Sequence, residues 1–328
     1  MKQFLNNNKE YPKRRYNIVI ISLVVLVAIL AGGNVWTIFY YIPQISGAGL
    51  IENKFNLLNP TRNFFKQKDL IINFQPLRDY LNDKYEANKN ISIYFEYLPT
   101  GASISINKDA EFWPASLLKL PVSMAVTKKI EKNEWKWTNE LVIMTSDKND
   151  GFGDLYKQPI GTKLAIEKLV QLSLSESDNT ANFVLVRNLE PFDFQDIYDH
   201  LGLTDFLSGE GKISAKKYSV MLRALYNSSY LSDENSQKLL NFLNETPFKE
   251  YLGSGLPDSV KFSHKIGVSD DQKVFLDSGI VFVQNRPYIL TAMLQTENKE
   301  YAEKVMKDIS EQAYQYVVNY SGKEEQNN

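Results

Sequence analysis

The chain has 328 residues, of which 43% are hydrophobic and 23% charged, a composition typical of a globular protein with one large domain or two small ones. The formal net charge is −2 and the basic residues after position 15 are dispersed, which argues against a nucleic-acid partner, because that affinity comes from clustered cations. The sequence contains no cysteine, which excludes disulfides, thiolate metal sites and a cysteine nucleophile.

The N-terminal part predicts a membrane anchor. Residues 17–42 are nearly uncharged and slightly exceed the ~20 residues that cross a bilayer. Basic residues precede this run and aromatic residues lie near its far end, namely Lys9, Lys13, Arg14 and Arg15, then Trp36, Tyr40 and Tyr41. The positive-inside rule then places residues 1–16 in the cytoplasm and everything after Pro43 outside, as a single-pass protein of the cell membrane. A cleaved signal peptide is the alternative, although the run is long and shows no small-x-small cleavage site.

The remaining chain divides into three parts. Residues 43–72 mix Gly, Asn, Pro and aromatic residues without periodicity and predict a juxtamembrane spacer. Residues 73–320 carry the regular patterns of one folded domain. The polar tail, 321–328, is predicted to be disordered.

Within that domain, strands flank a helical middle. A helix over 74–87 leads into a hairpin of 91–97 and 102–106 around a Pro-Thr-Gly turn. Helical patterns follow at 115–132, 162–174, 178–188, 193–201, 214–227 and 232–244. Strands return at 260–266, 274–284 and 287–296, before a last helix at 299–318. We therefore expect both ends of the domain to complete one sheet, with an all-helical part inserted, which is an α+β fold.

The first chemical motif is Trp113-Pro-Ala-Ser-Leu-Leu-Lys119 at a predicted helix start. Ser116 and Lys119 are three residues apart and share one helix face. A serine hydroxyl is a poor nucleophile unless a base takes its proton, and a partly buried lysine with a depressed pKa is such a base. The pattern alone is weak, since Ser214-Ala-Lys-Lys217 repeats it and is interpreted as an ordinary helix start.

Two further motifs follow in order. Ser177-Asp-Asn lies at the junction of two predicted helices, and His264-Lys-Ile-Gly267 lies on a predicted strand. Each has a simple structural interpretation, as a helix N-cap and as an exposed strand lysine. The only two histidines are His200 and His264, so a Ser-His-Asp triad would need one of them, and His264 is better explained as a neighbour of Lys265.

Taken together, the three motifs resemble the S-x-x-K, S-D-N and K-T/S-G pattern of the serine hydrolases that include class A β-lactamases and penicillin-binding DD-peptidases. The resemblance covers about 75–317, including Gly153-Asp-Leu ahead of Pro159-Ile-Gly-Thr, the strand 283–295 and the closing helix. It implies a three-layer α/β/α type of α+β fold, in which an antiparallel sheet flanked by helices meets an all-helical subdomain. The active site would lie in the cleft between them.

The resemblance also implies the catalytic roles. Ser116 would be the nucleophile, Lys119 the group that receives its proton, and Ser177 the hydroxyl that passes a proton to the leaving group. The implied substrate is a peptidoglycan peptide or a β-lactam, and no metal or cofactor is needed.

Substrate binding is implied for four further positions. Asn179 would contact the substrate amide and the lysine, and Lys265 would face the substrate carboxylate and support Ser177. Backbone N–H groups of Ser116 and of a strand residue near Val268, next to Gly267, would form the oxyanion hole.

Two departures from the pattern bear on turnover. The glutamate that activates the deacylating water in class A β-lactamases has no counterpart between Leu203 and Ser214, a stretch too short for the family's Ω-loop, where Glu210 is only a weak candidate. Ile266 replaces the hydroxyl residue of the third motif, and a lost charge-assisted hydrogen bond costs on the order of 1.5–3 kcal/mol in substrate binding. Poor deacylation is therefore expected.

Three hypotheses remain open at this level. The first is a membrane-anchored acyl-transfer enzyme that acts through a Ser116 acyl-enzyme on cell-wall D-amino-acid peptides or β-lactams. The second is a true β-lactamase with a non-standard deacylation base. The third is an inactive binding or scaffold module on the same fold.

Overall fold

The computed structural model describes residues 55–58, 70–203 and 205–321, which all belong to the compact unit Phe55–Asn328. The predicted anchor over 17–42, most of the predicted spacer and the tail residues 322–328 lie outside the described residues. Within the described ranges, no helix has the length and apolar character needed to cross a membrane.

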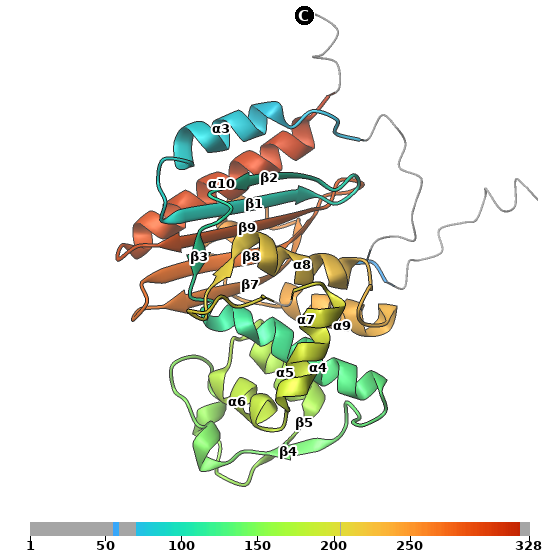
Figure 1. The fold of residues 1–328 in the computed structure, drawn as a ribbon. Helices are drawn as coiled ribbons and strands as arrows, with labels where there is room; N and C mark the ends of the chain where they lie inside the picture. The colour runs from blue at the N-terminus through green and yellow to red at the C-terminus, as the bar shows by residue number, and fades with distance from the viewer. Residues whose placement is uncertain (1–54, 59–69, 204, 322–328) are drawn as a thin grey trace, which may run out of the picture. The chain divides into compact units, whose positions relative to one another are not determined.

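A five-stranded sheet forms the centre of the unit (Figure 1). Its order is β2-β1-β9-β8-β7, and every neighbouring pair is antiparallel. The strands are β1 (Ile91–Tyr97), β2 (Ala102–Ile106), β7 (Lys261–Ser269), β8 (Val274–Phe282) and β9 (Tyr288–Gln295). The pairing of β1 with β9 confirms the prediction that both ends of the domain complete one sheet.

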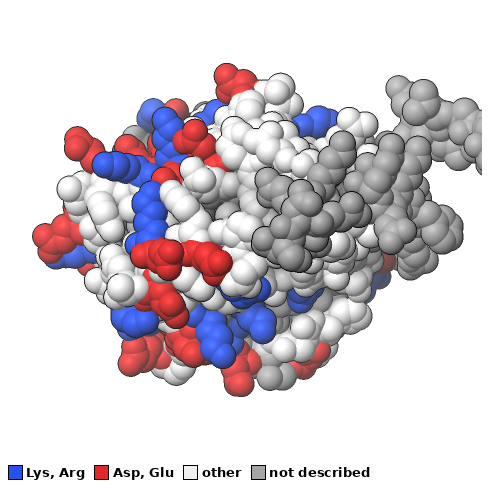
Figure 2. All heavy atoms as spheres, turned by 90° about the horizontal axis from the view of Figure 1, so that it is seen from above, with Lys and Arg blue, Asp and Glu red and all other residues white. Residues whose placement is uncertain are grey.

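Alternation along the strands creates two buried faces. On β1, Ile91, Ile93 and Phe95 belong to one hydrophobic cluster, whereas Tyr94 between them belongs to the other. The first cluster also contains side chains of α3 (Gln75–Tyr85) and α10 (Lys299–Asn319), which cover that face of the sheet (Figure 1). Viewed from the side of α3 and α10, acidic and basic side chains are interspersed (Figure 2).

The other face of the sheet is covered by the helical part. It contains α4 (Lys119–Glu131), α5 (Ile166–Ser175), α6 (Asn179–Arg187), α7 (Pro191–His200), α8 (Ala215–Tyr226) and α9 (Asp233–Asn244). α8 packs against β9, β8 and β1 and so joins the helical part to the sheet. One continuous cluster runs from Met293 in the sheet to Leu222 and Leu169 in the helices. The predicted α+β, three-layer arrangement is therefore confirmed.

Several boundaries differ from the predicted ones. The helix expected over 115–132 begins as a 3₁₀ turn, η3 (Ala115–Leu118), before α4. The expected helix 162–174 begins as β5 (Lys163–Ala165), which pairs with β4 (Glu140–Val142), and β3 (Glu111–Phe112) pairs with β6 (Ile213–Ser214). Strands of two or three residues are too short to show periodicity in a sequence. Three more 3₁₀ turns are η4 (Thr145–Asp147), η5 (Leu155–Lys157) and η6 (Leu252–Gly255).

Candidate active site

Ser116 lies in η3, where a strained backbone meets the edge strand β7. Ala115 just before it has φ +44°, a left-handed conformation that is uncommon for a residue with a side chain and is often found at functional sites. Gly267 of β7 lies so close to η3 that a Cβ added there would be 3.0 Å from the carbonyl oxygen of Pro114. The absence of a side chain at 267 therefore lets the strand approach closely the turn that carries Ser116.

Lys119, at the start of α4, is 97% buried and is surrounded by hydrogen-bond partners. Its Nζ lies 3.0 Å from Ser116 Oγ, 3.1 Å from Ser177 Oγ and 2.6 Å from Asn179 Oδ1, and it also donates to the Ser177 carbonyl. Burial lowers the pKa of Lys119 to about 7, and the negative charge of Asp178 opposes that shift. A substantial fraction of this amine is therefore neutral near pH 7.

Ser177 occupies a constrained junction between α5 and α6. Its φ is +55°, and the next residue, Asp178, caps α6 by accepting from Ala181 N at 2.8 Å. The second Asp178 oxygen accepts from Leu155 N, also at 2.8 Å. Gly153 approaches Asp178 so closely that an added Cβ would be 2.0 Å from Oδ2. The carboxylate of Asp178 is thus a structural group that fixes the backbone around Ser177.

Lys265 reaches the same hydroxyl from the sheet. Its Nζ donates to Ser177 Oγ at 2.9 Å and to the carbonyl oxygen of Ile266 at 3.3 Å. Burial, with the nearby charge of Lys119, holds the pKa of Lys265 well below its usual range. The side chains of Ser116, Lys119, Ser177 and Lys265 therefore form one continuous chain of hydrogen bonds between η3, α4, the α5–α6 junction and β7.

Asn179 is held by a residue that the motifs did not indicate. While Asn179 Oδ1 accepts from Lys119, its Nδ2 donates to Asn149 Oδ1 at 2.8 Å. Asn149 itself is fixed by backbone hydrogen bonds in both directions with the hydroxyl of Thr180. Asn149 lies in a loop thirty residues before Asn179, outside every motif and without periodicity, so no signal in the sequence identified it.

The residues of β7 divide between the two faces of the sheet. Lys265 and Gly267 face η3 and Ser177, whereas Ile266 is 3% exposed and belongs to the cluster beside α10. Val268 is half-buried and packs against that same cluster. Ile266 therefore contributes core packing and offers no hydrogen-bond donor to the cleft.

The segment expected to contain any deacylation base forms a short exposed turn. Glu210 is exposed and bonds to Lys212 at 2.6 Å, which lowers the pKa of the glutamate. Gly211, with φ +73°, closes the turn with a backbone bond to Ser208. In the described part of the chain, no carboxylate is hydrogen-bonded or ion-paired to Ser116, Lys119, Ser177 or Lys265.

The second S-x-x-K match and the two histidines have structural explanations. Ser214 is the N-cap of α8 and its hydroxyl accepts from Lys217 N, which confirms the interpretation of this second S-x-x-K as a helix start. His264 pairs with Asp277 on the face of β7 opposite Lys265, and His200 is exposed and bonds to the Ser229 carbonyl. Neither histidine is hydrogen-bonded to Ser116.

This fold and this Ser-Lys-Ser-Lys arrangement define a serine hydrolase of the β-lactamase type. The profile of the "Beta-lactamase enzyme family" matches residues 75–317. The chain is 24% identical to beta-lactamase VEB-1 of Pseudomonas aeruginosa over 250 residues, which cover 66% of this chain and 82% of that protein. The chain therefore belongs to the β-lactamase enzyme family.

Solved structures show the same fold. The structure of PBP-A superposes with a TM-score of 0.68 at 21% identity, covering 75% of this chain and 97% of PBP-A. A PBP-A mutant solved as an acyl-enzyme complex with penicillin G gives the same TM-score and identity, with 75% and 98% covered. The β-lactamase from Sphaerobacter thermophilus also has a TM-score of 0.68, at 22% identity, with 76% and 99% covered.

Proposed function

We propose that this protein is a membrane-anchored, extracytoplasmic acyl-transfer enzyme that forms an acyl-enzyme on Ser116 and hydrolyses it slowly. Its substrates would be D-amino-acid peptides of the cell wall, with β-lactams as analogues. The observation that carries the proposal is the complete hydrogen-bonded row from Ser116 to Lys265. By contrast, the segment in which the hydrolytic base is expected forms an exposed turn.

Acylation would begin with proton transfer from Ser116 to Lys119. In a neutral lysine, the two N–H groups can donate to the Ser177 carbonyl and Asn179 Oδ1, which leaves the lone pair for the Ser116 hydroxyl at 3.0 Å. As Oγ attacks the substrate carbonyl, its proton passes to Lys119 Nζ and negative charge develops on the carbonyl oxygen. The backbone N–H groups of Ser116 and Val268 are the expected donors to that oxygen.

Release of the amine would then use Ser177. Its Oγ lies between Lys119 Nζ at 3.1 Å and Lys265 Nζ at 2.9 Å, so it can give a proton to the leaving nitrogen and regain one from Lys119. The C–N bond breaks, the amine leaves protonated, and Ser116 keeps the acyl group as an ester. Lys265 supports the Ser177 oxygen by donating to it, and in its protonated form it would bind the substrate carboxylate.

Hydrolysis of that ester needs a base that activates water. Glu210 is exposed and paired with Lys212, and the buried Asp178 is committed to two backbone N–H groups. Slow deacylation follows, which is the behaviour of a penicillin-binding peptidase or transferase more than of an efficient β-lactamase.

Membrane attachment through residues 17–42 is part of the proposal and rests on the length, apolar character and charged flank of that segment. It would hold the enzyme at the extracytoplasmic surface of the cell membrane, where cell-wall peptides occur. Alkaline extraction of membranes and protease accessibility of the folded domain in intact cells would test it. Release of the full-length chain into the soluble fraction would contradict it.

The catalytic proposal is tested by intact-protein mass spectrometry of the full chain in detergent after incubation with a penicillin and with a D-alanine thioester. We expect an adduct of one acyl group per chain, which is absent from Ser116→Ala, because Ser116 is the proposed nucleophile. An inactive binding module, the reading that Ile266 favours, would give no adduct with either compound.

A further inference from the structure

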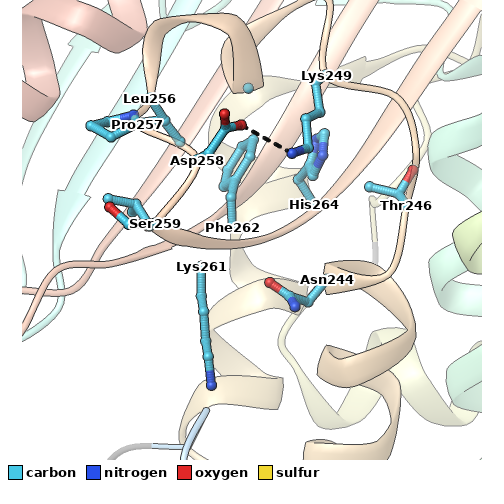
Figure 3. Close-up of a pocket in the computed structure, with 12 residues that line it drawn as sticks. Asn244, Thr246, Lys249, Leu256, Pro257, Asp258, Ser259, Lys261, Phe262 and His264 are labelled. Carbon is cyan, nitrogen blue, oxygen red and sulfur yellow. Dashed lines mark hydrogen bonds and ion pairs between the residues drawn. The ribbon is translucent and has the colours of Figure 1, made fainter.

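A pocket of about 260 Å³ lies beside the start of β7 (Figure 3). Its lining includes His264, on the face of β7 opposite Lys265. The pocket is enclosed by the end of α9, the loop that follows, η6 and the start of β7. Its polar and charged lining consists of Asn244, Thr246, Lys249, Asp258, Ser259, Lys261 and His264. None of these residues belongs to the hydrogen-bonded row of the catalytic site.

The imidazole of His264 is a buried hydrogen-bonding group in the lining of this pocket. Its Nδ1 lies 2.8 Å from Asp277 Oδ1, and the other oxygen of that carboxylate accepts from Leu252 N at 3.1 Å. The side chains of His264 and Asp277 are only 3% and 0% exposed, and the imidazole stacks on Phe262 with ring centroids 4.1 Å apart. The imidazole ring is therefore held in one orientation, with the Asp277 carboxylate at one edge and the Phe262 ring against its face.

The opposite ring nitrogen of His264 has no partner among the described residues. An ionised carboxylate only accepts hydrogen bonds, so Nδ1 must carry the proton that faces Asp277. In the neutral ring, Nε2 is then an acceptor. The residue is 98% buried and lines the pocket, so a ligand held there can donate an O–H or N–H to this acceptor.

The charges around the pocket narrow the choice of ligand. Lys249 contributes a cation beside the carboxylate of Asp258, while the lining residue Lys261 directs its ammonium group away from them (Figure 3). Lys249 pairs with Asp258 at 3.2 Å, but their side chains are 65% and 95% exposed, so this ion pair is weak and either side chain is free to turn. The hydroxyl of Thr246 supplies a further donor from the opposite wall. The lining thus offers a cation and a hydroxyl for anionic oxygens, next to an acceptor for an acidic proton.

We propose that this pocket binds hydrogen phosphate, with its O–H donated to His264 Nε2 and its anionic oxygens facing Lys249 and Thr246. Hydrogen phosphate combines an O–H donor with charged oxygens in one small group, and lysine ammonium groups bind such oxygens readily. Sulfate has a similar size and shape but carries no O–H at neutral pH, so the pocket should discriminate against it. The same chemistry occurs in free phosphate and in a protonated phosphate monoester.

The test uses the fact that the chain has only two histidines. Full-length protein labelled with ¹⁵N-histidine, in detergent, would be titrated with inorganic phosphate while the imidazole nitrogens are followed by NMR at constant ionic strength and pH. We expect a saturable change at His264 and none at His200, whose Nε2 already bonds to the Ser229 carbonyl. Sulfate and chloride should leave both signals unchanged, and methyl phosphate distinguishes a monoester site from one for the free ion.

Two lysine variants complete the test. Lys249→Gln should weaken phosphate binding about tenfold, near the low end for a charge-assisted hydrogen bond because this lysine is exposed. Lys136→Gln, which removes an exposed lysine outside the pocket, should leave the affinity unchanged. The proposal is overturned by the lack of a saturable change at His264, by an equal response to sulfate, or by equal affinities in the two variants.

Discussion

Two regions of this molecule differ sharply in how they are built. Around Ser116, four side chains from separate elements meet in one buried row of hydrogen bonds. The left-handed backbone at Ala115 and the close approach of Gly267 help to set their positions. The turn around Glu210 is exposed and closed by its own backbone, and its carboxylate pairs with the neighbouring Lys212. The contrast supports the proposal that the groups for forming an acyl-enzyme are preorganised, while those for hydrolysing it are not.

Replacing Lys119 by methionine should have the largest effect on the rate of acylation. The variant keeps the length of the side chain but removes the base, so the second-order rate of acylation should fall by about 10²–10⁴-fold. Stopped-flow measurements with a chromogenic β-lactam would give the rate. A variant that acylates at the native rate would show that another group takes the Ser116 proton.

The pH dependence of acylation also tests whether Lys119 is the base. Burial lowers the pKa of Lys119 to about 7, and the base must be deprotonated to act. The acylation rate should therefore rise about tenfold per pH unit below about pH 7 and level off above it, because the neutral amine becomes the main form there. A rate that stays flat from about pH 5 to pH 8 in a folded protein would rule out Lys119 as the base.

A pair of near-isosteric variants tests the third motif. Ile266→Thr should be less stable than Ile266→Val by about 1–3 kcal/mol, because the threonine hydroxyl would be buried beside α10 without a partner. Denaturant unfolding of the two proteins would measure this difference. Their acylation rates should agree, and faster acylation by the threonine variant would show that a side chain at 266 reaches the substrate.

The smallest effect is expected at the exposed turn. Glu210→Gln should change the lifetime of the acyl-enzyme by less than about twofold, because the carboxylate is solvated and paired with Lys212. Mass spectrometry of the adduct after removal of free penicillin would follow its decay. A lifetime prolonged tenfold or more would make Glu210 a deacylation base and erase the contrast between the two regions.

Much of this architecture was predictable from the sequence. The strands around 91–106 and 261–295 have clear alternation, and the three motifs occur in the order of a known family, so the sheet, the helical insertion and the candidate site residues could be identified. Lys265 and Ser177 come from elements far apart in the chain, yet the resemblance to a known family implied that Lys265 would support Ser177, and the two side chains are hydrogen-bonded.

Other features depend on tertiary contacts that leave no local pattern. Asn149 supports Asn179 from a loop, and the short strands β3 and β6 pair across about a hundred residues. The left-handed conformation of Ala115 occurs where η3 packs on β7 and goes against the preference of an alanine. The partner of His264 could not be predicted either, because Asp277 lies on the next strand and only the register of β7 on β8 brings the two residues together.

The central claim is that the acyl-enzyme forms readily and persists. The most direct measurement loads the full chain with a penicillin, removes the free compound rapidly, and follows the acylated fraction by intact-protein mass spectrometry. We predict nearly complete acylation that decays over many minutes to hours, with Ser116→Ala never acylated. Rapid hydrolysis of the penicillin without accumulation of an adduct would contradict the account and reveal an efficient deacylating base.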